Sequence, residues 1–519
     1  MKLRNLILLL LGLFCVDLFA FSAGLIFQSP TFNAPYYRIT FPLELQEDHI
    51  LLNKVMLNRQ EVKNYIVFQA KEKIDKTKPL KRGTYQIVID YAWRSKKDYS
   101  VTLDLVRYKS LKHQIKEIKG RSPESGGILG SLEGFYRVYQ IEEPIGLERI
   151  KEICSMVITA PKSEIEEGIF QVFDNGLEIP YQILEKKESN PSEKAVPDHP
   201  TTVSYKIAFP LTVEAGGKKL ITVLKGEHGF QTEKNFVITG EGLGKTVQTD
   251  WIKINFHPQS GQINTIDFLK EGLSLYNKAG VIHWNPDVFV PGLAWDHSFD
   301  WNPPEIFEEI NGNFLYLNSR KGFLPRIKDV WLEVKYIIEI DSPYFISETL
   351  LSFNNDLGVI AVRNDEMVLF KELFDSFILK TKEGKVVRGA LKEKEGVPFG
   401  LIHNTWEDVD WVGLVNSRQG YGFFSLRIKE LHANLDASGD FLYRPGTYFY
   451  APSDGNYVYW VRPLIYTWAD YMTNNLLTFV PKGSLFYEKN AYIGLKLTPD
   501  TEEKLNLLLT KLRNPLKVF

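Results

Sequence analysis

The most restrictive feature of this sequence is an alternation of apolar and polar residues that recurs along most of its 519 residues. In the run W-L-E-V-K-Y-I-I-E-I, the apolar alternate positions are Leu332, Val334, Tyr336, Ile338 and Ile340. A period of two places such residues on one face of a β-strand and the polar residues on the other face. Turn signals such as Gly216-Gly217 and Asp454-Gly455 separate the runs. The pattern predicts an all-β protein built from antiparallel sheets with one solvated side.

Helical periodicity is rare, and its clear case is the C-terminus. There Thr498 is expected to cap a helix whose first turn begins at Pro499. A leucine stripe then predicts one apolar face, formed by Leu505, Leu508, Leu509 and Leu512.

A chain of this length exceeds one ordinary core, and its composition predicts three units. Residues 30–115 are expected to form an immunoglobulin- or fibronectin-like β-sandwich, and residues 116–235 a second β-sandwich that acts as a linker domain. The basic run around residues 109–119 is interpreted as a solvated face or linker. Residues 236–519 hold most of the tryptophans and are nearly all strand-like, which predicts large stacked sheets followed by the C-terminal helix.

Residues 1–23 have the features of a secretory signal peptide. Lys2 and Arg4 precede an apolar run that is too short to span a bilayer comfortably, and small residues follow it. An uncleaved anchor is the alternative interpretation. We therefore expect a secreted or periplasmic protein with no transmembrane segment in the mature chain. Without residues 1–23, Cys154 is the only cysteine, and its apolar surroundings predict a small buried residue rather than a reactive one.

Charge and aromatic content limit the classes of ligand. The formal net charge is −2, which argues against a nucleic-acid-binding protein because such proteins need a strongly basic face. Aromatic residues make up 13% of the chain, and they suit both strands and glycan-binding surfaces. The oligomeric state is not predicted.

The segment from Ile282 to Pro304 concentrates aromatic and titratable side chains between prolines. It reads I-H-W-N-P-D-V-F-V-P-G-L-A-W-D-H-S-F-D-W-N-P-P, a mixture that favours neither a helix nor a regular strand, so we expect a rigid loop. Indole rings can stack on a pyranose, carboxylates accept hydrogen bonds from hydroxyls, and histidine transfers protons near neutral pH. The segment therefore predicts a carbohydrate site made of His283, Trp284, Asp287, Trp295, Asp296, His297, Asp300 and Trp301. The alternative is a packed loop in which the tryptophans plug the end of a sandwich.

Two further groups are candidates for the same site. His403, Trp406 and Glu407 lie in H-N-T-W-E-D-V-D-W, and their alternative role is an exposed acidic edge. In N-Y-V-Y-W-V-R-P, Tyr457 and Tyr459 share one strand face, and Arg462 would suit the carboxylate of a uronate. A strand with an aromatic face in the core is the alternative there.

No cofactor and no metal is expected. His283, Asp287, Asp296, His297 and Asp300 offer the residue types of a two-histidine, one-carboxylate site, but their spacing matches no strong zinc pattern.

Two stretches resemble the C-terminal β region of lysosomal-type α-mannosidases and related enzymes with the galactose-mutarotase-like super-sandwich. The first is Q-V-F-D-N-G-L-E-I-P-Y-Q-I-L at Gln171–Leu184, and the second is V-P-F-G-L-I-H-N-T-W-E-D-V-D-W-V-G-L-V-N-S-R-Q-G-Y-G-F-F-S-L at Val397–Leu426. The metal-binding pattern of the α-mannosidase catalytic domain is absent, so α-mannosidase activity is not carried over. The resemblance implies a super-sandwich whose concave sheet face is of the kind that sugar enzymes use.

Together these observations predict a carbohydrate-active protein that acts on a poly- or oligosaccharide by acid–base chemistry. Glycoside hydrolysis and β-elimination from a uronate both remain open. His283 and His297 are the expected proton-transfer groups, with His403 as their partner and Asp296, Asp300 or Glu407 as carboxylates. Stacking is expected from Trp284, Trp295, Trp301 and Trp406. The alternatives are a non-catalytic glycan-binding protein and a structural protein of the cell envelope.

Overall fold

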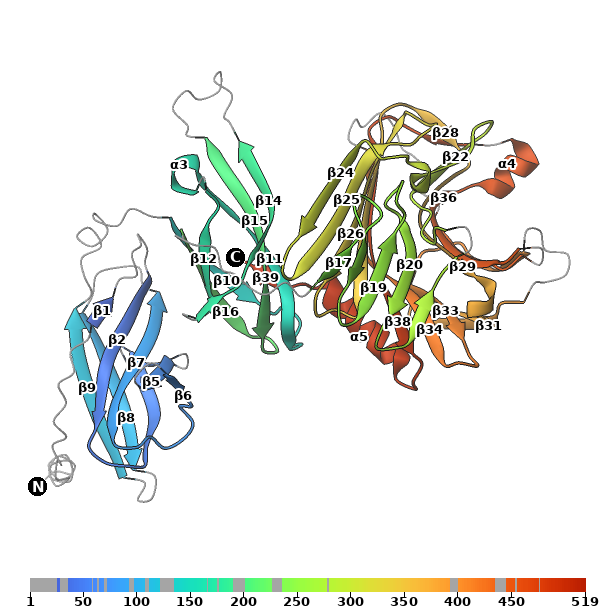
Figure 1. The fold of residues 1–519 in the computed structure, drawn as a ribbon. Coiled ribbons are helices and arrows are strands. Elements are labelled where there is room, and N and C mark those ends of the chain that lie inside the picture. Colours follow the sequence, from blue (N-terminus) through green and yellow to red (C-terminus); the bar gives the residue numbers. More distant parts are fainter. Residues whose placement is uncertain are drawn as a thin grey trace, which may run out of the picture.

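The computed structural model places most of the chain in antiparallel sheets (Figure 1). It describes residues 26–519 except 29–35, 58, 63–64, 70–71, 93–97, 108–111, 122–134, 166, 175–176, 190–200, 226–235, 278–279, 393–399, 435–444, 453–454 and 476. The predicted all-β class is confirmed. The proposed signal peptide, residues 1–23, lies outside the described residues and stays a prediction. In the described part of the chain, no helix has the length and apolarity needed to cross a membrane.

The N-terminal unit consists of two facing sheets with strand orders β1-β2-β7-β5-β6 and β4-β3-β8-β9. Alternate residues of the strands form its core, among them Phe41, Val55, Ile87 and Leu103, each fully buried. The basic run predicted as a linker is strand β9, which pairs along its whole length with β8 and so extends this unit past residue 115. The strands are β1 (Ile26–Gln28), β2 (Tyr36–Leu45), β3 (Ile50–Leu57), β4 (Gln60–Glu61), β5 (Tyr65–Gln69), β6 (Glu72–Ile74), β7 (Gly83–Ala92), β8 (Asp98–Arg107) and β9 (Lys112–Arg121).

The second unit packs a five-stranded sheet, β13-β12-β16-β10-β39, with a three-stranded sheet, β11-β15-β14. Cys154 is buried in its core, and burial raises the pKa of the thiol to about 12, as expected of an unreactive cysteine. The elements are β10 (Tyr136–Glu142), β11 (Arg149–Pro161), α3 (Lys162–Ile165), β12 (Phe170–Asp174), β13 (Leu177–Ile179), β14 (Gln182–Ser189), β15 (Thr202–Val213), β16 (Lys218–Lys225) and, from the far C-terminus, β39 (Lys517–Val518).

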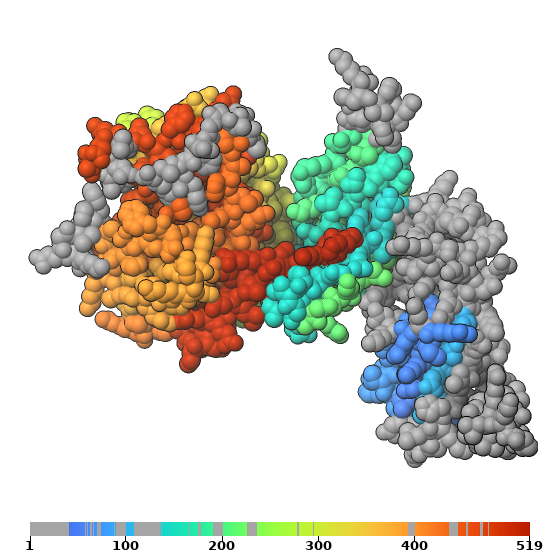
Figure 2. All heavy atoms as spheres, turned by 180° about the vertical axis from the view of Figure 1, so that it is seen from behind, coloured from blue at the N-terminus to red at the C-terminus, as the bar shows by residue number. Residues whose placement is uncertain are grey.

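Contacts of Gln182 and of the C-terminal segment join the second unit to the large C-terminal unit. The buried Gln182 amide donates to the Leu315 carbonyl at 2.8 Å and accepts from the backbone N–H groups of Phe314 and Leu315. A Cβ at Gly312 would lie 1.8 Å from Gln182 Cδ, so this approach requires glycine. The C-terminal segment crosses between the units (red in Figure 2), and Arg149 donates to the Asn514 carbonyl at 2.7 Å.

The large unit contains a nine-stranded sheet, β24-β25-β26-β27-β38-β34-β33-β30-β31, and a six-stranded sheet, β23-β22-β29-β36-β35-β32. The alternation in Val330–Glu339 appears directly in β26, where every second residue is buried. Their bounds are β22 (Asp287–Val290), β23 (Ala294–His297), β24 (Ile306–Asn311), β25 (Leu315–Phe323), β26 (Val330–Glu339), β27 (Tyr344–Phe353), β29 (Ala361–Phe370), β30 (Ser376–Thr381), β31 (Val386–Ala390), β32 (Leu401–Thr405), β33 (Val409–Asn416), β34 (Tyr421–Asn434), β35 (Thr447–Tyr450), β36 (Tyr457–Tyr466) and β38 (Ser484–Lys496).

Smaller elements complete this unit. A five-stranded sheet has the order β17-β18-β19-β20-β21, and β28 pairs with β37. Helix α5 begins at Thr501 with Asp500 at its N-cap, later than the predicted start at Thr498–Pro499, and it buries Leu505 and Leu509 of the predicted stripe. The bounds are β17 (Val237–Thr239), β18 (Thr246–Gln248), β19 (Ile252–Phe256), β20 (Ile263–Phe268), β21 (Leu273–Leu275), η1 (Ser298–Asp300), β28 (Leu357–Val359), η2 (Lys371–Leu373), α4 (Trp468–Asn474), β37 (Thr478–Val480) and α5 (Thr501–Arg513).

The six-stranded sheet has two chemically different faces. The inner face carries Met367, Leu369, Val458, Trp460 and Phe449, all of which pack into the common core of the large unit. Because side chains alternate across a strand, Glu366 of β29, Tyr459 of β36, and Tyr448 and Tyr450 of β35 lie on the opposite side, the outer face.

Candidate functional site

The segment expected to be a rigid loop is instead partly a β-hairpin, because β22 pairs with β23 through a short turn. The register sets Asp287 directly opposite His297. His297 Nδ1 lies 2.9 Å from Asp287 Oδ2, and both residues are buried, with His297 8% exposed and Asp287 not exposed at all. A carboxylate at Nδ1 orients the ring and makes Nε2 the nitrogen that can exchange a proton with a ligand.

Strand β29 adds a guanidinium and a second carboxylate to this pair. Arg363 Nε donates to Asp287 Oδ1 at 2.9 Å, and Arg363 Nη1 donates to Glu366 Oε1 at 3.0 Å. With its amide oriented to satisfy its neighbours, Asn285 donates to Asp287 at 3.1 Å and to Glu366 at 3.0 Å. We call Asn285, Asp287, His297, Arg363 and Glu366 the polar cluster.

The two carboxyl groups of the polar cluster differ in protonation. Burial raises the pKa of Glu366 to about 7, with Arg363 opposing the shift and Asp287 adding to it. Burial would also raise the pKa of Asp287, but Arg363 and His297 outweigh it and hold that pKa below its usual value. Near neutral pH, Asp287 is therefore ionised, while Glu366 can hold or release a proton. A pair of carboxyl groups with separated pKa values is typical of acid–base sites.

Aromatic rings surround His297. The Trp284 ring meets it edge-on with 5.7 Å between centroids, and the Phe299 ring lies at 4.8 Å. Trp295 lies 6.1 Å from the imidazole, and the Arg363 guanidinium sits 3.6 Å from the Trp295 ring centroid. Trp284, Trp295 and Phe299 are partly exposed. The imidazole is thus held among aromatic rings that are themselves partly exposed, while it is only 8% exposed.

Tyrosines continue this aromatic surface along β35 and β36. Tyr459 and Tyr450 stack with 5.0 Å between ring centroids, and the Tyr450 and Tyr466 hydroxyls are 3.2 Å apart. Tyr457 is also partly exposed and lies on the outer face with Tyr459. The alternate residues of the same strand, Val458 and Trp460, are buried. The outer face therefore combines aromatic rings with a small set of titratable groups, the combination found in many ligand-binding sites.

Asp296 and Asp300 lie beside the polar cluster but hold a neighbouring turn. Asp296 Oδ2 accepts from the backbone N–H groups of Arg326 and Ile327, both at 2.7 Å. Asp300 Oδ2 accepts from Arg326 Nη2 at 2.9 Å. Their carboxylates are thus engaged in fixing the turn, and so is Arg326.

His283 and Trp301 point into the core, which corrects the predicted roles of His283 in proton transfer and of Trp301 in sugar stacking. His283 is fully buried, its Nδ1 lies 2.7 Å from the Tyr336 hydroxyl, and burial lowers its pKa to about 4. Trp301 is 4% exposed, and its indole donates to the Phe323 carbonyl at 2.7 Å. For Trp301, the alternative interpretation of a tryptophan that plugs the sandwich describes the structure better.

His403, Trp406 and Glu407 lie at the other edge of the six-stranded sheet. His403 stacks on Phe377 with 5.0 Å between ring centroids, and Trp406 is 69% exposed. Strand β32, which carries His403, and β23, which carries His297, are the two edge strands. Five strand intervals separate them, roughly 24 Å along the sheet, so His403 is not the partner of His297 in one proton transfer.

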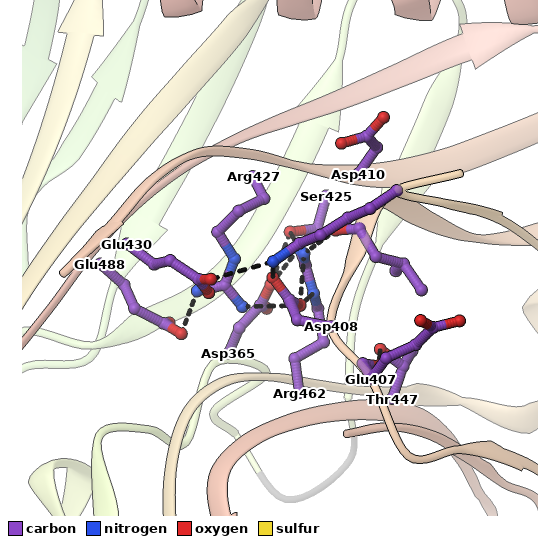
Figure 3. Close-up of polar contacts among 12 residues, drawn as sticks. Asp365, Glu407, Asp408, Asp410, Ser425, Arg427, Glu430, Thr447, Arg462 and Glu488 are labelled. Carbon is purple, nitrogen blue, oxygen red and sulfur yellow. Dashed lines mark hydrogen bonds and ion pairs between the residues drawn. The ribbon is translucent and has the colours of Figure 1, made fainter. Parts of the chain in front are cut away.

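Arg462 belongs to a buried ionic network on the inner face (Figure 3). Its Nη2 donates to Asp408 Oδ1 at 2.8 Å and its Nη1 to Asp365 Oδ2 at 3.3 Å. Arg427 also donates to Asp408 at 3.2 Å and pairs with Glu488. Figure 3 shows the Glu407 carboxylate directed away from this network. A fully buried Arg462 that is bound to two aspartates cannot grip a uronate, which corrects its predicted role.

Sequence reasoning missed Arg363 and Glu366. A signal for them exists in A-V-R-N-D-E-M-V-L-F, where four consecutive polar residues interrupt an apolar strand. All ten residues of β29 are buried, and charged residues are almost never fully buried unless they are paired. Such a run in a central strand therefore indicates a charge cluster on each face, here Asp365 on the inner face and Arg363 with Glu366 on the outer.

Two other observations concern metal ligands and cavities. Among the described residues, no cluster of three or more histidine, cysteine or acidic side chains could hold a metal ion. A cavity of about 1100 Å³ lies between the second and the large units, lined among others by Lys187, Lys206, Lys335 and Glu339. None of the predicted site residues lines this cavity.

Comparisons with known proteins found similarity only among solved structures. No family model matches the chain. No curated protein sequence matches it either. The chain is similar to a protein in the glycosyl hydrolase family 38 from Enterococcus faecalis, with a TM-score of 0.44 and 11% identity over 74% of this chain and 47% of that one. An α-mannosidase from the same organism gives a TM-score of 0.44 and 11% identity, with 74% and 46% covered.

A galactose mutarotase-like protein from Clostridium acetobutylicum is similar with a TM-score of 0.31 and 8% identity, over 51% of this chain and 100% of that one. The two protein classes named by the sequence resemblance are therefore both among these structures. The chain spans less than half the length of the two Enterococcus faecalis proteins.

Proposed function

We propose that the outer face of the six-stranded sheet binds a saccharide and transfers protons to and from it. The observation that carries this proposal is the polar cluster itself, in which a buried Glu366 and an Asp287–His297 pair meet within an aromatic surface. In this proposal His297 Nε2 is the group that contacts the sugar, Asp287 orients the ring, and Glu366 is the second proton-transfer group.

The charges of the polar cluster favour a neutral sugar. β-Elimination from a uronate needs a cation that neutralises the substrate carboxylate. Arg363 is already bonded to Asp287 and Glu366, and Arg462 is buried on the inner face. The Asp287 carboxylate likewise pairs with Arg363 and His297, so it is poorly suited to attack an anomeric carbon. Acid–base chemistry by His297 and Glu366, with water as nucleophile in a hydrolysis, fits these contacts better.

A specific observation favours a second candidate, a non-catalytic saccharide-binding face. Glu366 is only 2% exposed, so a sugar oxygen can reach it only if the surrounding rings move or if His297 relays the proton. A binding protein would use the same aromatic rings and would need no proton transfer.

The test is a screen of neutral and acidic polysaccharides, read by reducing ends and by the absorbance of unsaturated products. We expect reducing ends from a neutral glycan, and a loss of about 10²-fold or more in turnover for His297→Ala and Glu366→Gln. Glu488→Gln is the matched control, because burial also raises the Glu488 pKa to about 7, but Glu488 lies in the inner network. Binding without turnover would favour the second candidate, and neither binding nor turnover on any glycan would refute both.

A further inference from the structure

A row of aromatic rings crosses the outer face, interrupted by Arg363 and Glu366 of β29, and extends well beyond the polar cluster. It starts at Trp295 on β23, under the Arg363 guanidinium, and continues with Tyr459 on β36, which stacks on Tyr450 of β35. Tyr450 lies 6.4 Å from Tyr448, again measured between ring centroids. The row contains Trp295, Tyr459, Tyr450, Tyr466, Tyr448 and Trp406, and we call it the aromatic row.

Trp406 ends the aromatic row and is its most exposed ring. It meets Tyr448 edge-on with 6.1 Å between centroids, and Tyr448 in turn lies 4.7 Å from Tyr466. An indole that is 69% exposed loses little solvent contact from packing, so its position is not explained by the core. Its contact with Tyr448 makes it an extension of the same surface.

The length of the aromatic row exceeds what a single sugar needs. The row runs from β23 to the residue just after β32, the two edge strands of the six-stranded sheet. This span is roughly 24 Å along the sheet, several times the width of one pyranose ring. A monosaccharide at His297 would leave the partly exposed Tyr450 and Tyr466 and the exposed Trp406 without a ligand.

Resting on the proposed function, we propose that the aromatic row is a set of subsites for a linear neutral glycan that lies across the strands, with one end at His297 and the other at Trp406. The row offers rings for stacking along its length, whereas its one identified guanidinium, Arg363, is bonded to two carboxylates. Successive sugars would stack on the partly exposed rings of Tyr459, Tyr450 and Tyr466 and on Trp406, and the hydroxyls of these three tyrosines would hydrogen-bond to sugar hydroxyls. Tyr448 is only 2% exposed, so its role is to support the Trp406 ring rather than to contact the sugar.

The experiment measures dissociation constants for neutral linear malto-, cello- and manno-oligosaccharides of one to six sugars, with oligogalacturonates of the same lengths as the acidic comparison. For one neutral series, affinity is expected to rise with each added sugar up to at least the tetrasaccharide. Trp406→Ala should weaken the binding of the longest ligand roughly five- to tenfold and leave the affinity for the monosaccharide unchanged. Tyr450→Ala should already weaken the binding of ligands of intermediate length. Phe479→Ala is the matched control, because Phe479 is an exposed aromatic residue on β37, which pairs with β28 in a separate two-stranded sheet.

The outcomes separate this inference from the proposed function. If affinity is independent of length, or if Trp406→Ala and Tyr450→Ala change it no more than Phe479→Ala does, the aromatic row is not a set of subsites, while loss of activity in Glu366→Gln would still support the site at His297. If the acidic series binds more tightly than every neutral one, the neutral ligand class is wrong. If no saccharide binds, the proposed function falls together with this inference.

Discussion

His297 Nδ1 lies 2.9 Å from Asp287 Oδ2 because the β22–β23 hairpin places the two residues directly opposite each other. The pairing explains how residues ten positions apart form one acid–base unit. It also ties the unit to the sheet, since β22 pairs in turn with β29, the strand that carries Arg363 and Glu366. A rigid strand scaffold holds such geometry better than a loop does.

Replacing the Asp287 carboxylate by an amide should change the orientation and the tautomer of the His297 ring. In Asp287→Asn the imidazole loses its charged partner and Arg363 loses one of its two carboxylates, so we expect turnover to fall by about 10²-fold or more. NMR of the His297 ring nitrogens measures the tautomer directly, and the variant should show a changed Nδ1 signal. Unchanged Nδ1 and Nε2 signals in this variant would mean that Asp287 does not orient the ring.

Stability should depend on pH through Glu366. Its folded-state pKa of about 7 lies above the value of about 4.3 expected in the unfolded chain, so its contribution is fully present below about pH 4.3 and is lost as pH rises toward 7. Glu488 has the same direction of shift. Asp287 and Asp408 have lowered pKa values, so their contribution to stability is lost only when pH falls below about 3.9, the pKa of aspartate in the unfolded chain. The aspartates and the two glutamates therefore change stability in different pH ranges.

Thermal unfolding between pH 4.5 and 7.5 measures this effect. His283, whose pKa is lowered to about 4, acts in the opposite direction in the same window because it stabilises the fold as pH rises. The effect of Glu366 is therefore read as a difference: between pH 4.5 and 7.5 the melting temperature of Glu366→Gln should fall less, or rise more, than that of the unsubstituted protein, and Glu488→Gln should add to this difference. A pH dependence identical in all three proteins would show that neither carboxyl group titrates in this range.

Arg462→Ala distinguishes a structural from a ligand-binding arginine. Removing the guanidinium leaves Asp408 and Asp365 buried beside one another with one cation fewer, which should cost about 3–5 kcal/mol of unfolding free energy. Chemical denaturation measures that cost. Saccharide affinity of the folded variant should not change, because Arg462 lies on the inner face; a stable variant that has lost affinity for acidic glycans would restore the uronate interpretation.

The junction between the second and the large units should depend on Gln182 and Gly312 as a pair. Gly312→Ala places a methyl group against the Gln182 amide, and we expect it to destabilise the protein by about 1–3 kcal/mol. The same substitution should cost much less in a Gln182→Ala background, giving a coupling energy of about 1 kcal/mol or more in a double-mutant cycle. Additive effects would show that the two residues do not meet.

Much of the fold could be predicted from local sequence patterns. Alternation in Val330–Glu339 identifies β26 because one face of that strand is buried and the other is not. The same signal fails for β29, whose two faces are both buried, so its charged residues Arg363 and Glu366 carried no recognisable periodicity.

The candidate site could be predicted only in part. The composition of the 282–304 segment singled out Asp287, Trp284, Trp295 and His297, which the hairpin brings together. It could not separate them from His283 and Trp301, because which side of the segment faces the core depends on contacts with Tyr336 and Phe323, distant in the sequence. The distance between His403 and His297 likewise follows from strand order, which local patterns do not encode.

The most direct test of the central claim locates the bound saccharide by hydrogen–deuterium exchange. A neutral oligosaccharide that binds the protein should slow exchange in Asp287–Val290, Ala361–Phe370 and Thr447–Tyr450, the strands that carry the polar cluster and the aromatic row. Protection confined to Arg149–Pro161 and Val330–Glu339, which border the cavity between the units, would contradict the account and move the site there.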